Sequence, residues 1–265
     1  MKKLLPPAGV SFLLLTILMV SACRKTDLPC DPRDGKADLG LCQIREINNF
    51  PVEEEYNKRQ LLFTYNSKGD PVTVTPYSVG TGSPRWTFYY DKKGRLVTFA
   101  GLYDNGLFEF WHNYHYDNKD RIVSDSIYFF RPVSNPRDSL GWRHAQIIYD
   151  NLNRVVKDIY TAGPQSSFGN FTIDYTYDAR GNLNGSSFPY DDKANPLLTN
   201  KVWRFIARNY SVNNSGPASS YNANGLPTLF EYTPEAGLSF ALWPVDGLHV
   251  NFFYDCKGGY GGHGL

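Results

Sequence analysis

The sequence contains few cysteines, and their spacing does not suit a metal site. Only four occur among 265 residues, and no two are arranged as CxxC, the spacing that structural zinc sites commonly use. The chain also lacks a Gly-x-Ser-x-Gly nucleophile elbow and a glycine-rich phosphate loop before a helix. We therefore expect no cofactor, no bound metal and no enzymatic activity.

An excess of charge of one sign is also lacking. The formal net charge is +1, from 27 basic and 26 acidic residues. Non-specific binding to nucleic acid, or electrostatic docking on an anionic membrane, needs a clear basic excess. We therefore expect no nucleic-acid partner.

A long apolar run occurs only near the N-terminus. Two lysines precede an apolar stretch over 10–20, which is too short to span a bilayer as a helix. The stretch ends in Val20-Ser21-Ala22-Cys23, which resembles the lipobox of bacterial lipoproteins. This predicts a lipoprotein signal peptide over 1–22, lipid on Cys23, and an outer-membrane lipoprotein that faces the periplasm or the cell surface. An ordinary secretory signal cleaved nearby is the alternative.

Aromatic residues and turn formers are abundant. Aromatics make up 15% of the residues, with 23 Gly and 17 Pro, which suits many short strands. Seven segments share one pattern: Tyr, then Asp or Asn, two free positions, and then Gly, Asn or Asp. The turn-defining residues are Asn66 with Gly69, Asp91 with Gly94, Asp117 with Asp120, Asp150 with Asn153, Asp178 with Gly181, Asn222 with Gly225, and Asp255 with Gly258.

Each position of this repeat has a physical reason. Asp and Asn side chains accept hydrogen bonds from backbone amides two residues on, so they start turns. Gly, Asn and Asp tolerate the positive φ that a three-residue hairpin loop with a bulge requires. Aromatic residues that alternate before the turn, such as Phe63 and Tyr65, lie on one face of a strand.

The repeat predicts an all-β, antiparallel up-and-down array of about fourteen strands over 41–258. The array is either a curled sheet or a closed barrel, and closure would remove exposed edges. A barrel that spans the outer membrane is an alternative. Charged strand and turn residues such as Arg95 and Asp158 argue against it, because the lipid face of such a barrel must be apolar.

Three segments differ from the repeat. Residues 23–40 are polar and rich in Pro, Asp and Gly, as in a flexible tether. Residues 190–214 form an insertion in which Val202, Phe205 and Ile206 have helical spacing, so we expect one short helix over a sheet face or plugging one end. Residues 259–265 form a glycine-rich tail.

Export implies an oxidising compartment, where disulfides form. If Cys23 carries lipid, then Cys30, Cys42 and Cys256 remain. A Cys42–Cys256 bond would join the first predicted strand to the last repeat, and we favour it. A Cys30–Cys42 bond around a short local loop is the alternative.

Two resemblances follow from these motifs. The Tyr-Asp-x-x-Gly-Arg turns resemble the YD repeats of Rhs and teneurin shells. Residues 41–258 more closely resemble a family of Bacteroidota lipoproteins of unknown function described as having a porin-like fold. The shared segments are Cys42-Gln43-Ile44, the stretches at 190–196 and 209–214, and Phe253-Tyr254-Asp255-Cys256. This resemblance supports the Cys42–Cys256 bond and implies no activity.

The polar residues give only weak indications of a metal site, a catalytic site or a modification site. His112 and His115 would lie on opposite faces of a strand and could not share a metal. Asp178, Asp191 and Asp192 could suggest calcium or a glycosidase pair, but aspartates are ordinary in turns. Ser139 and Ser126 lie in Asp-Ser-aliphatic sequences, which resemble a periplasmic O-glycosylation sequon.

The tryptophans allow two interpretations. Trp86, Trp111 and Trp203 could form a platform on which sugar rings stack, or they could simply belong to the core. We expect a lipid-anchored envelope protein that acts as a non-catalytic binding or structural module, with a glycan or a protein as its ligand. An envelope hydrolase acting on glycans is the competing hypothesis.

Overall fold

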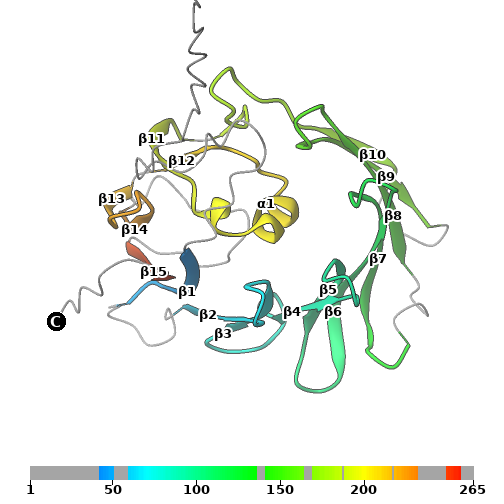
Figure 1. The fold of residues 1–265 in the computed structure, drawn as a ribbon. Coiled ribbons are helices and arrows are strands. Elements are labelled where there is room, and N and C mark those ends of the chain that lie inside the picture. The colour runs from blue at the N-terminus through cyan, green and yellow to red at the C-terminus, as the bar shows by residue number, and fades with distance from the viewer. Residues whose placement is uncertain are drawn as a thin grey trace, which may run out of the picture.

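A computed structural model describes residues 42–50, 59–135, 141–163, 169–186, 188–216, 218–231 and 249–257. Most of these residues lie in antiparallel strands (Figure 1). The strands are β1 (Cys42–Asn48), β2 (Gln60–Tyr65), β3 (Pro71–Pro76), β4 (Arg85–Tyr90), β5 (Leu96–Leu102), β6 (Leu107–Tyr116), β7 (Ile122–Pro132), β8 (Trp142–Tyr149), β9 (Val155–Ala162), β10 (Phe171–Asp174), β11 (Tyr190–Ala194), β12 (Asn213–Ser215), β13 (Ala218–Tyr221), β14 (Pro227–Glu231) and β15 (His249–Cys256). A 3-10 helix, η3 (Pro196–Thr199), and an α-helix, α1 (Lys201–Ala207), lie between β11 and β12.

Thirteen of the strands form one curled sheet, as the repeat predicts. Their order is β10-β9-β8-β7-β6-β5-β4-β3-β2-β1-β15-β14-β13, and β11 and β12 form a separate pair. The sheet curves around α1, and β11 and β12 lie on the side where the curl stays open, between the edge strands β10 and β13 (Figure 1). The edge strands β10 and β13 are not hydrogen-bonded to one another. The sheet is therefore curled and open, and the closed-barrel alternative is wrong.

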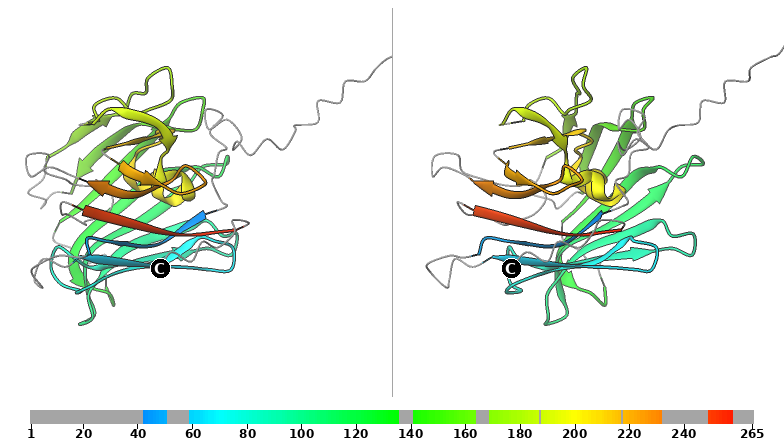
Figure 2. Two further views of the ribbon diagram at one scale, coloured as in Figure 1. Left: turned by 90° about the vertical axis from the view of Figure 1, so that its left-hand side faces the viewer. Right: turned by 60° about the vertical axis from the view of Figure 1, so that its left-hand side comes forward.

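The order of the strands is not a simple succession of hairpins. β15 pairs with β1 from Cys42↔Cys256 to Asn48↔Asn251, so the first and last described strands lie side by side inside the sheet (Figure 2). β14 and β13 follow on the far side of β15. The two edges of the sheet, β10 and β13, therefore do not come from the first and last described strands.

Six of the seven predicted turns are present and share one hydrogen-bond pattern. In the turn at Asp91, the carboxylate accepts from the amides of Lys93 and Arg95, both at 2.9 Å, and Gly94 has φ +80°. Asp120 and Asn153 stand at the glycine position with φ of 57° and 58°, as the turn chemistry requires. The turns at Asn66, Asp117, Asp150, Asp178 and Asn222 repeat these bonds.

The seventh predicted turn is wrong at Asp255. This residue lies inside β15 and pairs with Gln43, because the partner strand β1 extends the ladder through it. Gly258 lies outside the described residues.

The tyrosine of the repeat connects one hairpin to the one before it. Tyr116, for example, donates a hydrogen bond of 2.8 Å to the carbonyl of Leu96, five residues after Asp91. The other such pairs are Tyr90 with Pro71, Tyr149 with Ile122, Tyr177 with Val155, and Tyr254 with Pro227. Arg95 completes the unit, because it pairs with Asp91 at 2.8 Å and lies 4.6 Å from the centre of the Tyr116 ring.

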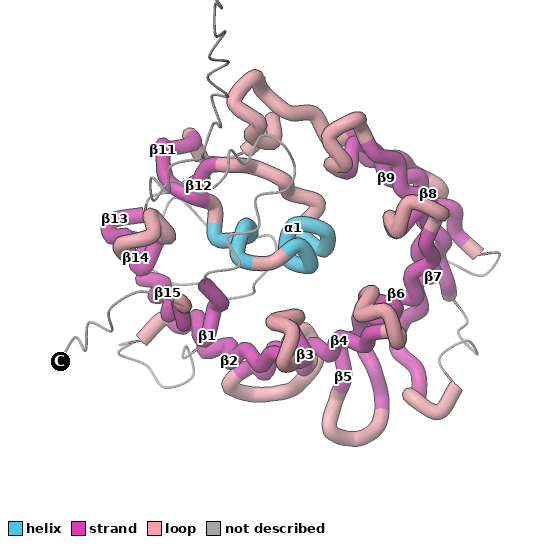
Figure 3. Tube along the Cα trace, in the orientation of Figure 1, coloured by secondary structure: helices cyan, strands magenta, loops and turns pink. Residues whose placement is uncertain are grey.

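The core lies inside the curl, between the inner face of the sheet and α1 (Figure 3). Trp203 of α1 is fully buried and meets Phe63 and Phe88 edge-on, at 5.7 and 5.6 Å between ring centres. The insertion at 190–214 therefore contains the predicted helix, which packs inside the sheet. It also contains β11 and β12, which the sequence did not predict. Among the described residues, no helix has the length and apolar character needed to cross a membrane.

Candidate functional site

The inner face of β6–β10 carries a group of polar side chains that we call the inner polar cluster. The strands β6, β7 and β9, the segment after β10, and the end of α1 contribute to it. Its members are His112 from β6, Asp125 from β7, Asp158 and Tyr160 from β9, Tyr175 just after β10, and Arg208 at the C-terminal cap of α1.

Asp158 and Arg208 form a buried ion pair. Asp158 has no exposed surface, and its Oδ2 lies 2.7 Å from Nε of Arg208. The hydroxyls of Tyr160 and Tyr175 donate to the same oxygen at 3.3 and 3.2 Å. Burial alone would lower the pKa of Arg208, but the charge and hydrogen bond of Asp158, together with the buried hydroxyls of Tyr114 and Tyr160, outweigh it and the pKa is raised. The pair ties α1 to β9.

α1 is also fixed at its other end. Asn200 caps the helix by accepting from the amide of Val202 at 2.9 Å, and its amide group donates to the carbonyl of Gly69 at 3.0 Å. Gly69 belongs to the turn between β2 and β3. With Arg208 bound to β9, the helix bridges two distant parts of the curled sheet.

Asp125 pairs with a histidine at the inner surface. Asp125 is 2% exposed, and its Oδ2 accepts a hydrogen bond of 2.7 Å from Nδ1 of His112. The His112 side chain keeps 22% of its surface exposed. Burial and the charge of Asp125 raise the pKa of Tyr114, the neighbour of Asp125 on β6, well above its ordinary value.

Each aspartate keeps one oxygen without a hydrogen-bond partner among the described residues. These are Oδ1 of Asp125 and Oδ1 of Asp158, and both are buried. A buried carboxylate oxygen without a donor is costly, and native proteins rarely leave one so. A group that donated hydrogen bonds to these two oxygens would therefore stabilise the cluster.

Aromatic rings surround these acceptors. His112 stacks on Phe99 at 5.5 Å, and Phe110 lies edge-on to it at 5.6 Å. Phe171, which is 39% exposed, stacks on Tyr160 at 4.5 Å. Burial and the charge of Asp158 raise the pKa of Tyr160 to about 12, so its hydroxyl stays protonated at neutral pH. The cluster thus combines carboxylate acceptors with apolar ring faces.

A shallow groove of about 460 Å³ lies on β13–β15. Ser220, Thr228 and Asn251 supply polar groups, and Leu229 and Phe253 supply apolar surface. Phe253 is 39% exposed, and the guanidinium of Arg45 lies 5.7 Å from its ring centre. This groove is a second candidate surface, without a buried acceptor like those of the inner polar cluster.

The three tryptophans of the predicted platform do not share one exposed surface. Trp203 is fully buried. Trp86 lies on the inner face, packs against the core and meets Phe99 edge-on at 5.5 Å. Trp111 stacks on Tyr89, which alternates with buried Phe88 and so lies on the outer face. The core interpretation therefore holds for Trp203, and the platform as predicted is wrong.

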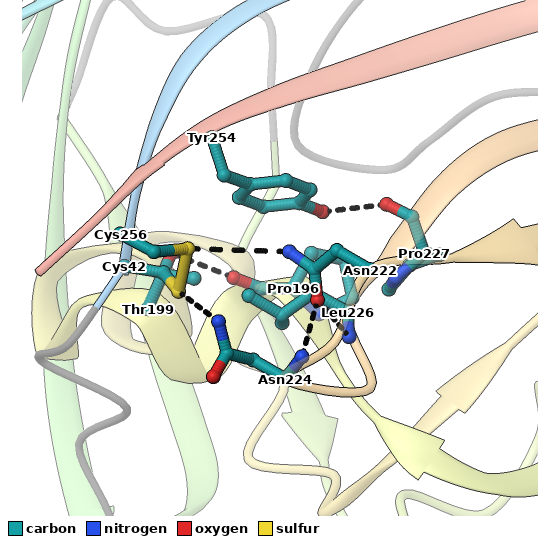
Figure 4. The surroundings of a disulfide bond; sticks show 9 residues. All are labelled: Cys42, Pro196, Thr199, Asn222, Asn224, Leu226, Pro227, Tyr254 and Cys256. Atoms are coloured by element: carbon teal, nitrogen blue, oxygen red, sulfur yellow. Dashed lines mark hydrogen bonds between the residues drawn. A yellow bond between two sulfur atoms is a disulfide. The ribbon is translucent and has the colours of Figure 1, made fainter. Parts of the chain in front are cut away.

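Cys42 and Cys256 are joined by a disulfide, the pairing that the sequence favours. The bond is surrounded by η3 and the β13–β14 turn (Figure 4). Asn224 donates to the Cys42 sulfur at 3.3 Å, and Leu198 and Leu226 pack with Cys42 in a small second core. Cys30 and Cys23 lie outside the described residues.

The remaining candidates are dispersed. His115 is exposed on β6, and Ser126 lies in β7 opposite Asn113 and His144. Asp191 accepts from Tyr221 and Asn214, whereas Asp192 is exposed beside Lys193. Ser139 lies outside the described residues. Within the part of the chain that the structure describes, no group of three His, Cys, Asp or Glu side chains could hold a metal ion.

The sequence analysis did not single out the inner polar cluster. A signal exists, because Asp125 and Asp158 occupy positions in apolar strands that share a face with Ile127 and Tyr160. An acidic residue at such an inward position predicts a buried charge. Its partner Arg208 is 50 residues away from Asp158 in the chain, and nothing local in the sequence indicates that contact.

Comparison with known proteins gives little. No protein-family model matches the chain, and no curated protein matches it. Among solved structures, the crystal structure of TcdB2-TccC3 without its hypervariable C-terminal region is similar, with a TM-score of 0.29 and 11% identity over 66% of this chain and 9% of that one. TcdB2-TccC3 itself gives a TM-score of 0.21 and 14% identity over 81% and 11%. The chain spans about a tenth of those proteins, and similarity this weak carries no functional argument.

Proposed function

We propose that this protein is a lipid-anchored cell-envelope protein that binds a glycan, without cleaving it, on the inner face of β6–β10. Sugar hydroxyls donate hydrogen bonds to carboxylates, and the C–H faces of sugar rings pack on aromatic side chains. The inner polar cluster supplies both kinds of group within one curved surface. The anchor is proposed from the lipobox-like sequence that ends at Cys23.

One observation carries the proposal. The buried Oδ1 atoms of Asp125 and Asp158 have no donor among the described residues. Their partly exposed neighbours in the cluster are His112, which bonds to Asp125, and Phe171, which stacks on Tyr160. In a low-dielectric setting, a hydrogen bond to a carboxylate is stronger than one between neutral groups. Because both oxygens are buried, a donor-rich ligand would satisfy them only if the side chains that cover them moved aside on binding.

Asp125 is the better residue for a test, because Asp158 also holds Arg208. Asp125→Asn keeps the shape of the side chain but replaces one acceptor oxygen by a donor group. We expect a thermal-shift screen with oligosaccharides and peptidoglycan fragments to raise the Tm for one glycan class. We expect Asp125→Asn to weaken that binding about tenfold or more, since a hydrogen bond to a charged group contributes about 1.5–3 kcal/mol.

Asp192→Asn is the matched control, because the side chain of Asp192 is 86% exposed and lies away from the cluster. It should bind as the wild type does. Binding that survives Asp125→Asn unchanged, in a protein that remains folded, would rule out this site.

A glycan hydrolase is the second candidate, because two carboxylates share the inner face and glycosidases act through such a pair. Against it, Oδ2 of Asp158 is already engaged by Arg208 and by the hydroxyls of Tyr160 and Tyr175, which is a poor position from which to protonate a glycosidic oxygen. Product analysis of each bound oligosaccharide separates the two functions. Release of shorter products by the wild type but not by Asp125→Asn would identify a hydrolase.

The anchor has an independent test. In a bacterial host, Cys23→Ala should move the protein from the membrane fraction to the soluble fraction, and intact mass should show the loss of the acyl groups. A protein that stays in the membrane fraction after this change is held by something else.

A further inference from the structure

The outer face of β4–β8 carries a continuous row of aromatic side chains, which we call the outer aromatic row. Trp111 of β6 is paired with Tyr128 of β7, and Tyr128 is paired with Trp142 of β8. Tyr89 of β4 stacks on Trp111 at 6.2 Å between ring centres. Cross-strand partners lie on the same face of a sheet, and Trp111 directly precedes the inward-facing His112. The row therefore lies on the face opposite to the inner polar cluster.

Two of these rings lie over small residues. A Cβ on Gly163 would meet Nε1 and Cε2 of Trp142 at 2.7 Å and Cδ2 at 2.9 Å, so the indole of Trp142 fills the space above this glycine. Ala100 is paired with Trp111 and has no exposed surface, although it faces outward. The large neighbouring indole of Trp111 accounts for this burial. Rings held over the sheet in this way turn one face to solvent, and Trp142 keeps 39% of its surface exposed.

A row of polar side chains runs beside the aromatic row, two residues further along each strand. Its members, paired in sequence across β5–β8, are Thr98, Asn113, Ser126 and His144. Oδ1 of Asn113 accepts hydrogen bonds of 3.1 Å from Oγ1 of Thr98 and from Nε1 of Trp111. These bonds fix the indole and leave the amide hydrogens of Asn113 without a partner among the described residues. A ligand along this surface therefore meets ring faces on one side and hydrogen-bonding groups on the other.

The charge and size of this double row indicate the class of ligand. Neither row contains an aspartate, a glutamate, a lysine or an arginine, which suits an uncharged ligand. Five strands about 4.8 Å apart make the surface about 20 Å long, and two residues along each strand make it about 7 Å wide. A stable protein interface needs about 800 Å² per partner, which is several times this area. The double row is therefore too narrow for a stable dimer but suits a long, thin chain.

We propose that the outer aromatic row binds one extended, uncharged polysaccharide chain that runs across β4–β8. The C–H faces of its sugar rings stack on the aromatic side chains, and its hydroxyls bond to the polar row. Trp111 and Trp142 are two strands apart, about 10 Å, so they stack on separate sugar rings of the same chain. The site is independent of the inner polar cluster, because the sheet lies between the two.

Affinity electrophoresis in native gels tests this proposal, with xylan, glucomannan and hydroxyethylcellulose as separate probes. We expect at least one of these polysaccharides to retard the protein. Trp142→Ala should weaken the binding about tenfold, because the bound chain no longer covers the apolar face of an indole. Trp142→Phe keeps a ring at this position and should retain most of the binding.

Phe253→Ala is the matched control, because Phe253 is also 39% exposed but lies on β15, outside the row. It should be retarded as the wild type is, and so should Asp125→Asn, which changes only the inner polar cluster. No retardation by any of the three polysaccharides, or unchanged retardation of a Trp142→Ala protein with the wild-type Tm, would overturn the proposal. Loss of retardation in Phe253→Ala or Asp125→Asn, but not in Trp142→Ala, would place the polysaccharide elsewhere and would also overturn it. A dimer in analytical ultracentrifugation that Trp142→Ala dissociates would assign the row to a second copy of the chain instead.

Discussion

The strands β2–β9 and the region from β10 to β13 differ in how far apart in the chain their contacting residues lie. In β2–β9, the repeat turns at Asn66, Asp91, Asp117 and Asp150 are built from bonds within five residues, and the tyrosine before each of these turns donates to a carbonyl of an earlier strand. In the region from β10 to β13, the contacts join residues far apart in the chain. Asn182 and Asn213 bond to each other reciprocally, at 3.1 and 2.9 Å, and Arg208 reaches Asp158.

This difference shows how a repeat protein gains a specific site. The repeats alone would give a regular curled sheet with an apolar inner face. The insertion places α1 inside that sheet and fixes it at Asn200 and Arg208. The buried charges of the inner polar cluster are retained where the insertion meets the repeats. The following four predictions test this contrast, from the largest expected effect to the smallest.

Removal of Arg208 should damage the long-range region most. Arg208→Ala leaves the fully buried carboxylate of Asp158 without its charge partner, which typically costs about 3–5 kcal/mol. Urea unfolding should show this loss. Lys193→Ala is the control, because its only described ion pair is on the surface and such pairs contribute about 0–1 kcal/mol. Equal losses in the two variants would contradict the role given to the buried pair.

A glycine of the repeat should cost less to replace. Gly94 has φ +80°, and a Cβ there would meet only the flexible end of Lys68 at 3.2 Å. Gly94→Ala should therefore destabilise through backbone strain, by about 1–2 kcal/mol. Asp120→Gly is the reverse change, at φ 57°, and should stabilise or be neutral. Thermal unfolding of both variants measures the difference, and a destabilising Asp120→Gly would show that the side chain of Asp120 matters more than its φ.

Loss of one tyrosine hydroxyl should have a smaller effect. Tyr116→Phe removes the 2.8 Å bond to Leu96 and keeps the ring under Arg95. We expect a loss of about 1 kcal/mol in the free energy of unfolding. Tyr89→Phe is the control, because Tyr89 lies on the outer face. An unchanged stability for Tyr116→Phe would mean that the hydroxyl does not connect the hairpins.

The turn aspartates should give a small dependence of stability on pH. Hydrogen bonds from backbone amides, with the nearby arginine, lower the pKa of Asp91 and of Asp117. A lowered pKa in the folded state stabilises the fold above the unfolded pKa near 4, and this contribution is lost as the pH falls through the folded value. Asp91→Asn with Asp117→Asn should flatten the dependence below pH ~4, since Asn66 makes the same backbone bonds. An equally steep acid loss in the double variant would assign it to other groups.

The local part of the fold could be predicted from sequence, and the long-range part could not. The turn at Asp91 and the helix around Trp203 follow from side-chain chemistry and spacing within a few residues. The place of β15 between β1 and β14 does not, because every strand carries the same alternation and any two could pair. The disulfide from Cys42 to Cys256 was the one sequence clue to that arrangement.

The same limit applies to the candidate site. Asp125 and Asp158 could be recognised as inward-facing charges once their strands were assigned. Their grouping with His112 and Arg208 depends on strand order and on the position of α1, which are tertiary properties. The wrong turn at Asp255 has the same cause, because pairing with β1 overrides the local turn pattern.

The most direct test of the account is to map the bound glycan on the protein. Amide NMR signals would be followed while the glycan that gives the largest thermal shift is added. The account predicts shifts at His112, Asp125 and Tyr160 on the inner face, and much smaller shifts in Asp125→Asn at the same glycan concentration. Shifts at Phe253 and Asn251 instead would place the ligand in the groove of β13–β15 and would contradict the inner polar cluster as the binding site.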